Sequence, residues 1–249
     1  LGLDVGLVGF LIERLEPSGS SGLGPPQKKH KDNHPRTDHW YELFDVANPE
    51  EAGVFEEKFE GNVIDLQKVK PLGQKVPRKR IFLRSCYASI FNIIWEKFDM
   101  AEMQTITVTG TPGIGKSLFG LLFLIELVRV LLRGQASCNK LVNFGKTKLD
   151  GRIVYEYVKG VNDNSLYYLI DTDSKTITAT SASPDEWLFV NGNVFHIKDG
   201  PCTSAPTFCP TLWTSSPRAG SFQKTMDLGP SYFLPPWTAD ELVECWRAK

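Results

Sequence analysis

The chain has 249 residues, enough for one or two domains with a hydrophobic core. It contains 28 lysines and arginines and 29 aspartates and glutamates, so its formal net charge is −1. This balance argues against a protein that coats nucleic acid or binds membranes through a polybasic surface. Hydrophobic residues at 41% and charged residues at 23% are ordinary values for a globular protein and exclude a wholly disordered chain.

Residues 1–39 are predicted to form a partly disordered N-terminal segment. Leu1–Leu15 lacks the basic start, the continuous apolar stretch and the small-residue cleavage site of a signal peptide. Pro17–His39 is rich in glycine, serine, proline and lysine, which is typical of a flexible linker. We therefore set the first boundary of the chain at residue 39.

Residues 40–80 form a weakly patterned region that we assign to no element, and a basic run begins within it. Its basic residues are Lys75, Arg78, Lys79, Arg80 and Arg84. Runs of this kind are usually solvated surfaces or nuclear-import signals. The run is also the one feature of the sequence that suggests DNA binding.

Residues 81–249 are predicted to form an α/β domain. Apolar residues at helical spacing predict a helix over 87–98, and the β-branched run Thr105–Thr109 predicts a strand. Further strands are predicted at 152–158, 166–170, 175–180, 194–197 and 211–214. Thr238 and Glu241 have the spacing of a capping box, so a last helix is expected to begin after Thr238.

The most apolar stretch of the chain, Leu118–Leu132, is predicted to lie in a buried helix. The helix begins at Lys116 and is expected to end near Arg133–Gly134, because glycine suits a C-terminal cap. Two charged residues interrupt the stretch, and it is shorter than the roughly 20 residues that span a bilayer. We therefore expect no membrane span.

Residues 110–117 read Gly-Thr-Pro-Gly-Ile-Gly-Lys-Ser and match the G-x-x-x-x-G-K-[ST] motif (Walker A) at every fixed position. The glycines allow backbone N–H groups to face phosphate oxygens, and the helix that follows directs its positive dipole end at the same anions. The lysine adds a charge for the β- and γ-phosphates, and the serine adds a hydroxyl ligand for Mg²⁺. The residues predicted to bind the nucleotide are Gly110, Thr111, Pro112, Gly113, Ile114, Gly115, Lys116, Ser117 and Leu118.

Such a site also needs an acidic residue to hold Mg²⁺ together with Ser117, and two candidates compete. Asp199 follows the run Val194–Lys198 and leads into a loop. Asp171 follows a more apolar strand, but it begins a turn between two strand-like runs, where aspartate is common for backbone reasons. We predict Asp199 as the metal ligand and catalytic carboxylate, with Asp171 as the alternative.

Arg218 is the third residue predicted to act in catalysis, with Lys116 and Asp199. It ends a polar segment that follows the predicted strand 211–214, where an arginine can offset charge on the γ-phosphate in the transition state. The alternative is a surface arginine. No acid adjoins Asp199, so the general base is unassigned, and Glu186 is a candidate whose position the sequence does not give.

Thr147–Asp150 matches the [NT]-K-x-D pattern with which GTPases read guanine, but it follows the Walker A motif at residues 110–117 by only about 30 residues. In GTPases the guanine-reading pattern follows, in sequence, the strand that carries the magnesium-binding aspartate. We interpret the segment as a solvated turn, and we expect ATP and Mg²⁺ as the ligands.

The five cysteines and the histidines predict neither a disulfide framework nor a metal site. The cysteines are odd in number, scattered, and form no C-x-x-C pair, which favours a reducing place of action. His196, Cys202 and Cys209 are close in sequence, but their spacing matches no common zinc motif.

Five segments occur in one order and together resemble the P-loop NTPase module of Crinkler-type effectors and retrotransposon hot spot proteins. They are Thr109–Phe119, the hairpin Leu166–Thr180, Asp199-Gly200, Thr214–Arg218 and Leu234–Thr238. Arg84-Ser85-Cys86-Tyr87 also resembles that group. The resemblance covers about Ile81–Lys249.

The resemblance implies a P-loop NTPase three-layer sandwich with a mostly parallel sheet, distantly similar to the signal-transduction ATPases. Such modules are often joined to a C-terminal nuclease or kinase-like domain, and this domain is expected to be truncated at its C-terminal end. The family is secreted by eukaryotic microbes and acts inside host cells, commonly in the nucleus, so a host protein or DNA is the candidate partner. Two other functions stay open: a nucleotide-gated switch with little turnover, and a protein- or DNA-binding module that keeps a P-loop.

Overall fold

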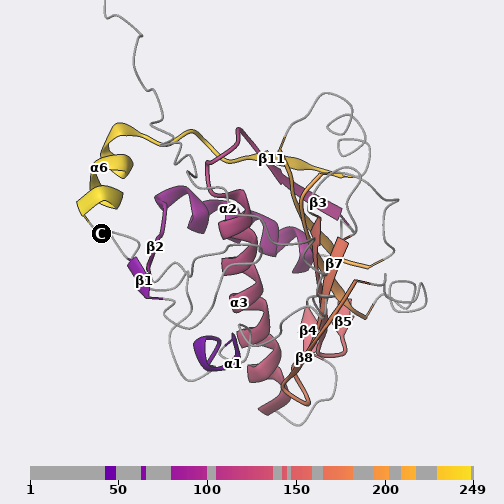
Figure 1. Ribbon diagram of the computed structural model, residues 1–249. Helices are drawn as coiled ribbons and strands as arrows, with labels where there is room; N and C mark the ends of the chain where they lie inside the picture. The colour runs from indigo at the N-terminus through magenta and orange to yellow at the C-terminus, as the bar shows by residue number, and fades with distance from the viewer. Residues whose placement is uncertain are drawn as a thin grey trace, which may run out of the picture. The chain divides into compact units, whose positions relative to one another are not determined.

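A seven-stranded β-sheet with α-helices on one face forms the main part of the computed structural model (Figure 1). The structure describes residues 43–48, 63–65, 80–99, 105–136, 142–144, 147–158, 165–181, 193–201, 209–216 and 229–247, all within the unit His34–Lys249. The helices are α1 (Leu43–Val46), α2 (Ser85–Asp99), α3 (Lys116–Ala136) and α6 (Ala239–Arg247). The strands are β1 (Val63–Asp65), β2 (Arg80–Phe82), β3 (Thr105–Thr109), β4 (Val142–Phe144), β5 (Thr147–Leu149), β6 (Arg152–Val158), β7 (Ser165–Asp171), β8 (Thr176–Thr180), β9 (Phe195–Asp199), β10 (Thr211–Thr214) and β11 (Ser231–Phe233).

The main sheet is mixed and mostly parallel, with the strand order β11-β3-β10-β9-β6-β7-β8. Strands β11, β3, β10, β9 and β6 run parallel to one another, and β7 and β8 extend the sheet beyond β6 as an antiparallel hairpin. Two antiparallel pairs, β1–β2 and β4–β5, form separate small sheets. The predicted α/β class with a mostly parallel sheet is therefore confirmed.

The burial of each strand follows from its place in the sheet. Every residue of β3, β9 and β10 is buried, as expected for parallel strands in the interior of a sheet. Strands β7 and β8 retain partly exposed residues, which fits a hairpin at the edge of a sheet. β3 consists of threonine, isoleucine and valine, whose branched side chains favour the extended conformation.

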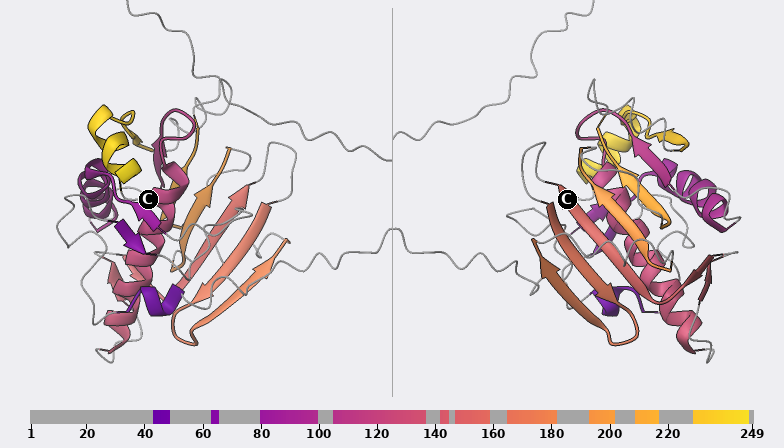
Figure 2. Two further views of the ribbon diagram at one scale, coloured as in Figure 1. Left: turned by 60° about the vertical axis from the view of Figure 1, so that its left-hand side comes forward. Right: turned by 90° about the vertical axis from the view of Figure 1, so that its right-hand side faces the viewer.

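Helices α1, α2 and α3 lie on one face of the main sheet (Figure 2). The aromatic rings of Phe98 on α2 and Phe123 on α3 lie 5.0 Å and 5.7 Å from the ring of Phe195 on β9, so one cluster joins both helices to the sheet. No helix of the described residues covers the opposite face (Figures 1 and 2). The three-layer sandwich therefore remains a prediction.

Helix α3 carries the core, and nearly all of its apolar side chains are buried, as predicted for Leu118–Leu132. The two charges that interrupt the stretch are buried and paired with each other, Arg129 donating to Glu126. Arg129 also donates to the carbonyls of Val46 and Asn48 at 3.1 Å and 3.2 Å, which ties the end of α1 to α3. Among the residues that the structure describes, no helix combines the length and the apolarity needed to cross a bilayer.

Several local predictions were wrong. Helix α3 continues past Gly134 to Ala136, because the glycine is tolerated inside the last turn and does not cap it. Thr147–Leu149 is a strand, β5, with Leu149 buried, and not a solvated turn. Arg84, counted in the basic run, is fully buried, so it belongs to no solvated surface or import signal.

A buried charged cluster lies on the sheet face opposite α3. Lys198 on β9 is 3.2 Å and His196 is 3.1 Å from the carboxylate of Glu156 on β6, and Ser165 donates to the same group at 2.7 Å. Burial alone would raise the pKa of Glu156, but the hydrogen bond from His196 and the charge of Lys198 outweigh it and hold the pKa at about 2. The ionised carboxylate thus stabilises the β6–β9 pairing.

Replacing Glu156 by glutamine (E156Q) is expected to destabilise the fold at pH 7 by about 3 kcal/mol, because Lys198 loses its buried counter-charge. Since the folded pKa of about 2 lies below the ordinary 4.5, the wild type loses this stabilisation as the pH falls from about 4.5 to 2. The difference in unfolding free energy between wild type and E156Q, from urea titrations, should therefore be smaller at pH 3 than at pH 7 by about 2 kcal/mol.

The matched control is Glu96→Gln, an acid-to-amide change at an exposed position of α2. It removes the same charge without touching the cluster, so its effect on stability should be small at both pH values. A difference for E156Q that is equal at pH 7 and pH 3 would contradict the assignment of Glu156 as an ionised, paired carboxylate.

Candidate functional site

The candidate site lies at the end of the main sheet where the carboxyl ends of the parallel strands β11, β3, β10 and β9 lie side by side. β10 pairs with β3 and β9 so that Thr214 lies opposite both Val108 and Asp199. Backbone bonds continue past the strand ends, from the Ser215 amide to the Val108 carbonyl (3.0 Å) and from the Leu234 amide to the Thr109 carbonyl (2.9 Å). In open α/β sheets, ligands bind outside the carboxyl ends of parallel strands.

Residues 110–115 form the turn between β3 and α3, as the motif predicts. Gly110, Gly113 and Gly115 have φ angles of 144°, 82° and 95°, which favour glycine over any other residue. A Cβ on Gly115 would in addition lie 2.0 Å from the hydroxyl oxygen of Tyr87. Thr111, Pro112 and Gly113 are exposed, whereas Ile114 is buried and Leu118 packs partly against the core.

Lys116 is the first residue of α3, and its ammonium group closes the turn. It donates to the carbonyl oxygens of Gly110 at 2.8 Å and Thr111 at 2.7 Å, and the residue is only 8% exposed. Burial lowers the pKa of Lys116, and the negative charge of Asp199 opposes this shift. A positive charge is thereby held against the carbonyl oxygens at the start of the loop.

Ser117 and Asp199 are 82 residues apart in sequence and in direct contact. The Ser117 hydroxyl donates to Oδ1 of Asp199 at 2.9 Å, and the Thr214 hydroxyl donates to the same oxygen at 2.8 Å. Burial raises the pKa of Asp199, while the bonds from Thr214 and Ser117 and the charge of Lys116 oppose that rise. The site thus joins a lysine and a serine from α3, a carboxylate from β9 and a threonine hydroxyl from β10.

The alternative acid, Asp171, lies at the other end of the strands. Asp171 pairs with Arg152 at the start of β6, whereas Asp199 pairs with Tyr157 near its end. The Asp171 carboxylate accepts a bond from the amide of Ser174 at 2.9 Å within the β7–β8 turn. The predicted hairpin is confirmed, and Asp199 is the candidate that contacts Ser117, directly after the loop of residues 110–115.

The [NT]-K-x-D segment also lies away from the loop. Asp150 directly precedes β6, and its carboxylate is paired with the guanidinium of Arg152. The start of β6 is at the opposite end of the sheet from Asp199. This position gives no support to a guanine-reading role.

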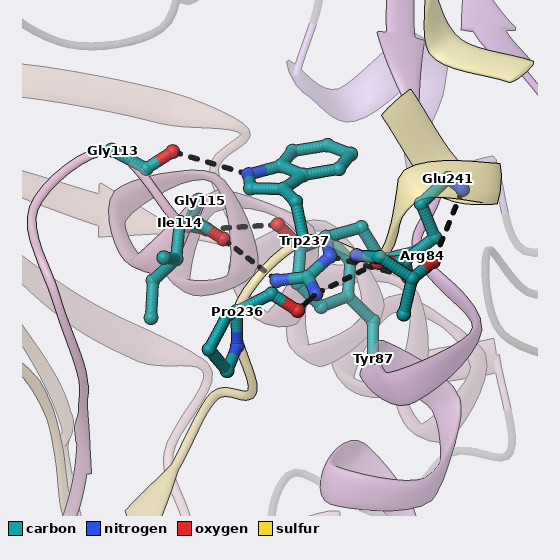
Figure 3. Close-up of polar contacts among 9 residues, drawn as sticks. Arg84, Tyr87, Gly113, Ile114, Gly115, Pro236, Trp237 and Glu241 are labelled. Carbon is teal, nitrogen blue, oxygen red and sulfur yellow. Dashed lines mark hydrogen bonds and ion pairs between the residues drawn. The ribbon is translucent and has the colours of Figure 1, made fainter. Parts of the chain in front are cut away.

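Three side chains hold the outer side of the loop, and Figure 3 shows them together. The carbonyl groups of residues 113–115 accept hydrogen bonds, in order, from Trp237 Nε1 (3.4 Å), Arg84 NH1 (3.1 Å) and the Tyr87 hydroxyl (3.1 Å). Sequence reasoning assigned a role to none of these donors. The signals that could have found them are Arg84-Ser85-Cys86-Tyr87 and Leu234–Thr238, which belong to the resemblance in the motifs.

Arg84 links the loop to the C-terminal segment of the described chain. Its guanidinium donates to the carbonyl of Pro236 at 2.9 Å and pairs with both carboxylate oxygens of Glu241 at 3.0 Å and 3.3 Å. The ring of Trp237 lies over the same guanidinium, 4.6 Å from its carbon (Figure 3). We refer to Arg84, Ile114, Pro236, Trp237 and Glu241 as the Arg84 cluster.

The remaining predicted residues lie outside the part of the chain that the structure describes. They are Arg218, Glu186, Cys202 and the basic residues at 75, 78 and 79. Among the described residues, no group of three histidines, cysteines or acids is placed to hold a metal ion. His196 instead contacts Glu156, and Cys209 is buried.

Substituting Gly115 by alanine (G115A) should destabilise the protein by about 2 kcal/mol or more, because the φ of 95° and the contact with Tyr87 both oppose a Cβ. Tyr87→Phe alone should cost about 1 kcal/mol, the net value of one hydrogen bond. In the Y87F background the same G115A change should cost less, because the oxygen that the Cβ meets is gone. Thermal unfolding of the four proteins measures this, and an equal G115A effect in both backgrounds would disprove the contact.

Comparison with known proteins finds distant relatives. No protein-family model matches the chain, and no solved structure matches it significantly. Crinkler effector protein 15 of Phytophthora infestans is 25% identical over 200 residues, and Crinkler effector protein 16 of the same organism is 24% identical over 200 residues. The alignments cover 74% of this chain and 26% of each relative, so the chain spans about a quarter of their length. The chain is therefore distantly similar to Crinkler effectors, in agreement with the resemblance in its motifs.

Proposed function

We propose that this chain binds ATP with Mg²⁺ at residues 110–118 and Asp199 and hydrolyses it, as the P-loop NTPase module of a Crinkler-like effector. The observation that carries the proposal is the 2.9 Å contact between Ser117 and Asp199 beside the buried ammonium of Lys116. Sequence motif and tertiary contact are independent here, because Asp199 is not part of the motif. A chance glycine-rich turn would need no carboxylate from another strand.

Phosphate binding is assigned to the turn and the start of α3. The N-terminus of a helix offers free N–H groups and a positive dipole end to an anion. Lys116 now donates to the carbonyls of Gly110 and Thr111, and a phosphate would give this ammonium an anionic acceptor in place of two neutral ones. The buried position of Lys116 strengthens such a contact, since the local dielectric is low.

The residues beside the loop fit Mg²⁺. The ion prefers hard oxygen ligands at 2.0–2.1 Å in octahedral geometry, so two adjacent ligands lie about 2.9 Å apart. The hydroxyl oxygen of Ser117 and Oδ1 of Asp199 are separated by 2.9 Å. When bound, the ion would neutralise charge on the phosphate oxygens, and in this chain Ser117 and Asp199 are the residues that would hold it.

Turnover by this chain depends on charges placed around the transferring phosphoryl group. Lys116 supplies one positive charge in the described part of the chain, and Asp199 would contribute by holding the metal ion. Arg218 is proposed as a further positive charge, at the end of the segment that follows β10. An arginine in this role accelerates phosphoryl transfer by about 10³–10⁵ where it has been measured. ATP is proposed over GTP because the [NT]-K-x-D segment lies at the other end of the sheet.

A nucleotide-gated switch with slow turnover is the second candidate. It is favoured by the glycine, not a second acid, that follows Asp199, so a neighbouring general base is missing from the sequence at that point. Tight binding of a fluorescent ATP analogue without phosphate release would select the switch, and release that needs Mg²⁺ would select the hydrolase. An effector role inside a host cell rests on the distant similarity to the two Crinkler proteins.

Replacing Lys116 by alanine (K116A) should weaken binding of Mg-ATP by about 10- to 100-fold, the effect of losing one or two charge-assisted hydrogen bonds. Isothermal titration with Mg-ATP measures the loss. Lys175→Gly is the matched control, because Lys175 lies in the β7–β8 turn and its φ of 51° suits glycine. Equal affinity of wild type and K116A would refute the phosphate-loop assignment.

Replacing Asp199 by asparagine (D199N) should lower Mg²⁺-dependent phosphate release about 100-fold or more, because a metal ion in such sites contributes several kcal/mol to the transition state. Asp171→Asn removes an equal charge at the opposite end of the strands and should leave the rate within about threefold of wild type. A steady-state phosphate-release assay at saturating ATP compares the two. If D171N is the inactive variant, the carboxylate has been assigned to the wrong strand.

A further inference from the structure

We propose that Arg84 is a positioning residue that couples the phosphate loop to helix α6, so that anion binding at the loop and docking of residues 234–247 stabilise each other. This inference rests on the proposed function of the loop and adds a regulatory connection to it. It also assigns a role to a buried charge that the proposed chemistry does not use. Arg84 is 0% exposed, and its contacts lead in two directions, to the loop and to α6.

The loop amides point away from the three side chains that bind the loop carbonyls. A trans peptide unit points its C=O and its N–H to opposite sides. The carbonyls of residues 113–115 point outward to Trp237, Arg84 and Tyr87, so the N–H groups of residues 114–116 point to the other side, toward the inside of the turn. These are the amides that a phosphate would use. The outer donors therefore hold the anion-binding conformation of the loop.

Helix α6 is attached through polar contacts at its N-terminus. This helix has no buried residue, and Leu242, Val243 and Trp246 on it are exposed, so little apolar burial holds it in place. Its N-terminus depends on Glu241, whose Oε2 accepts the backbone N–H of Thr238 at 3.0 Å and the guanidinium of Arg84 at 3.0 Å. The Thr238 hydroxyl in turn accepts the amide of Glu241 at 3.1 Å, completing the capping box.

One carboxylate thus serves two structures, the cap of α6 and the buried guanidinium. Although partial burial raises the pKa of Glu241, the bonds from Arg84 and Thr238 outweigh it and leave the pKa lowered. If α6 leaves its position, Arg84 loses its anionic partner while it is still buried against the Ile114 carbonyl. A buried charge without its partner is strongly unfavourable, so the guanidinium would move and release that carbonyl.

Coupling of this kind is reciprocal. Whatever factor α6 docking adds to the affinity of the loop for an anion, anion binding adds to the docking of α6. Measured factors between coupled sites are typically about 5- to 150-fold. Because Glu241 is not fully buried and only one of the loop carbonyls depends on Arg84, we expect a value near the lower limit here.

The test uses Glu241→Gln (E241Q) and its matched control Glu244→Gln (E244Q), which makes the same change at an exposed position of the same helix. Affinity for a non-hydrolysable ATP analogue with Mg²⁺ is measured by titration in the whole chain. Amide hydrogen exchange of residues 239–247 is followed with and without the analogue. We expect the analogue to slow this exchange in wild type and E244Q, and E241Q to bind it about 3- to 10-fold more weakly and to lose the protection.

A second variant, Arg84→Lys (R84K), keeps the charge but cannot form the two-pronged bond to Glu241 together with the bonds to Ile114 and Pro236. It should resemble E241Q, and E241Q alone suffices if R84K does not fold. Equal analogue affinity and equal exchange in E241Q and E244Q would overturn the coupling while leaving the loop assignment intact. If the wild type binds no analogue at all, the proposed function is overturned, and the coupling with it.

Discussion

Parallel pairing of β3, β10 and β9 is the constraint on which the candidate site depends. In this register Thr214 lies opposite both Val108 and Asp199, so the three strands end at the same level. Helix α3 follows β3 after the loop of residues 110–115, and the hydroxyl of Ser117 in its first turn donates to the Asp199 carboxylate at 2.9 Å. A slip of one residue would turn the face of β9 and bring Lys198 to the position of Asp199. Burial of every residue of β9 makes that slip unfavourable.

The two faces of the sheet bury different kinds of side chain, apolar rings on one and paired charges on the other. Toward α3 the strands contribute apolar residues, and the rings of Phe98, Phe123 and Phe195 fill the space between α2, α3 and β9. On the opposite face Glu156 lies close to His196 and Lys198, both from β9. Pairing between neighbouring strands is what allows charged residues to lie inside the sheet.

Arg84, beside the candidate site, is likewise a buried charge that is paired with an opposite charge. A buried guanidinium has five N–H donors in a fixed fork, and here they reach the loop, the Pro236 carbonyl and Glu241. The loop conformation is thereby tied to residues that lie far away in sequence. Three segments of the chain, Arg84, the loop at residues 113–115 and Pro236–Glu241, are joined in this way.

The sequence by itself determined the local elements whose signals are short-range. The β-branched run gave the bounds of β3, the glycine motif gave the turn before α3, and the capping box of Thr238 and Glu241 gave the start of α6. The α/β class could also be predicted from the helix and strand patterns, whereas the mostly parallel sheet was expected from the resemblance of the motifs. Local signals failed where tertiary packing overrides them, as at Gly134 inside α3 and at β5, which pairs with β4.

Only the tertiary structure shows that Asp199, and not Asp171, lies beside Ser117. The sequence favoured Asp199 because Asp171 has the setting of a turn, but it does not give the direction of either strand in the sheet. β7 runs antiparallel to β6, so Asp171 lies at the end of the sheet opposite the loop of residues 110–115. In the same way Arg84 has the sequence context of a basic run, and its burial against Glu241 depends on a helix 157 residues later. Contacts between residues this far apart are set by strand order and side-chain pairing, which no local pattern encodes.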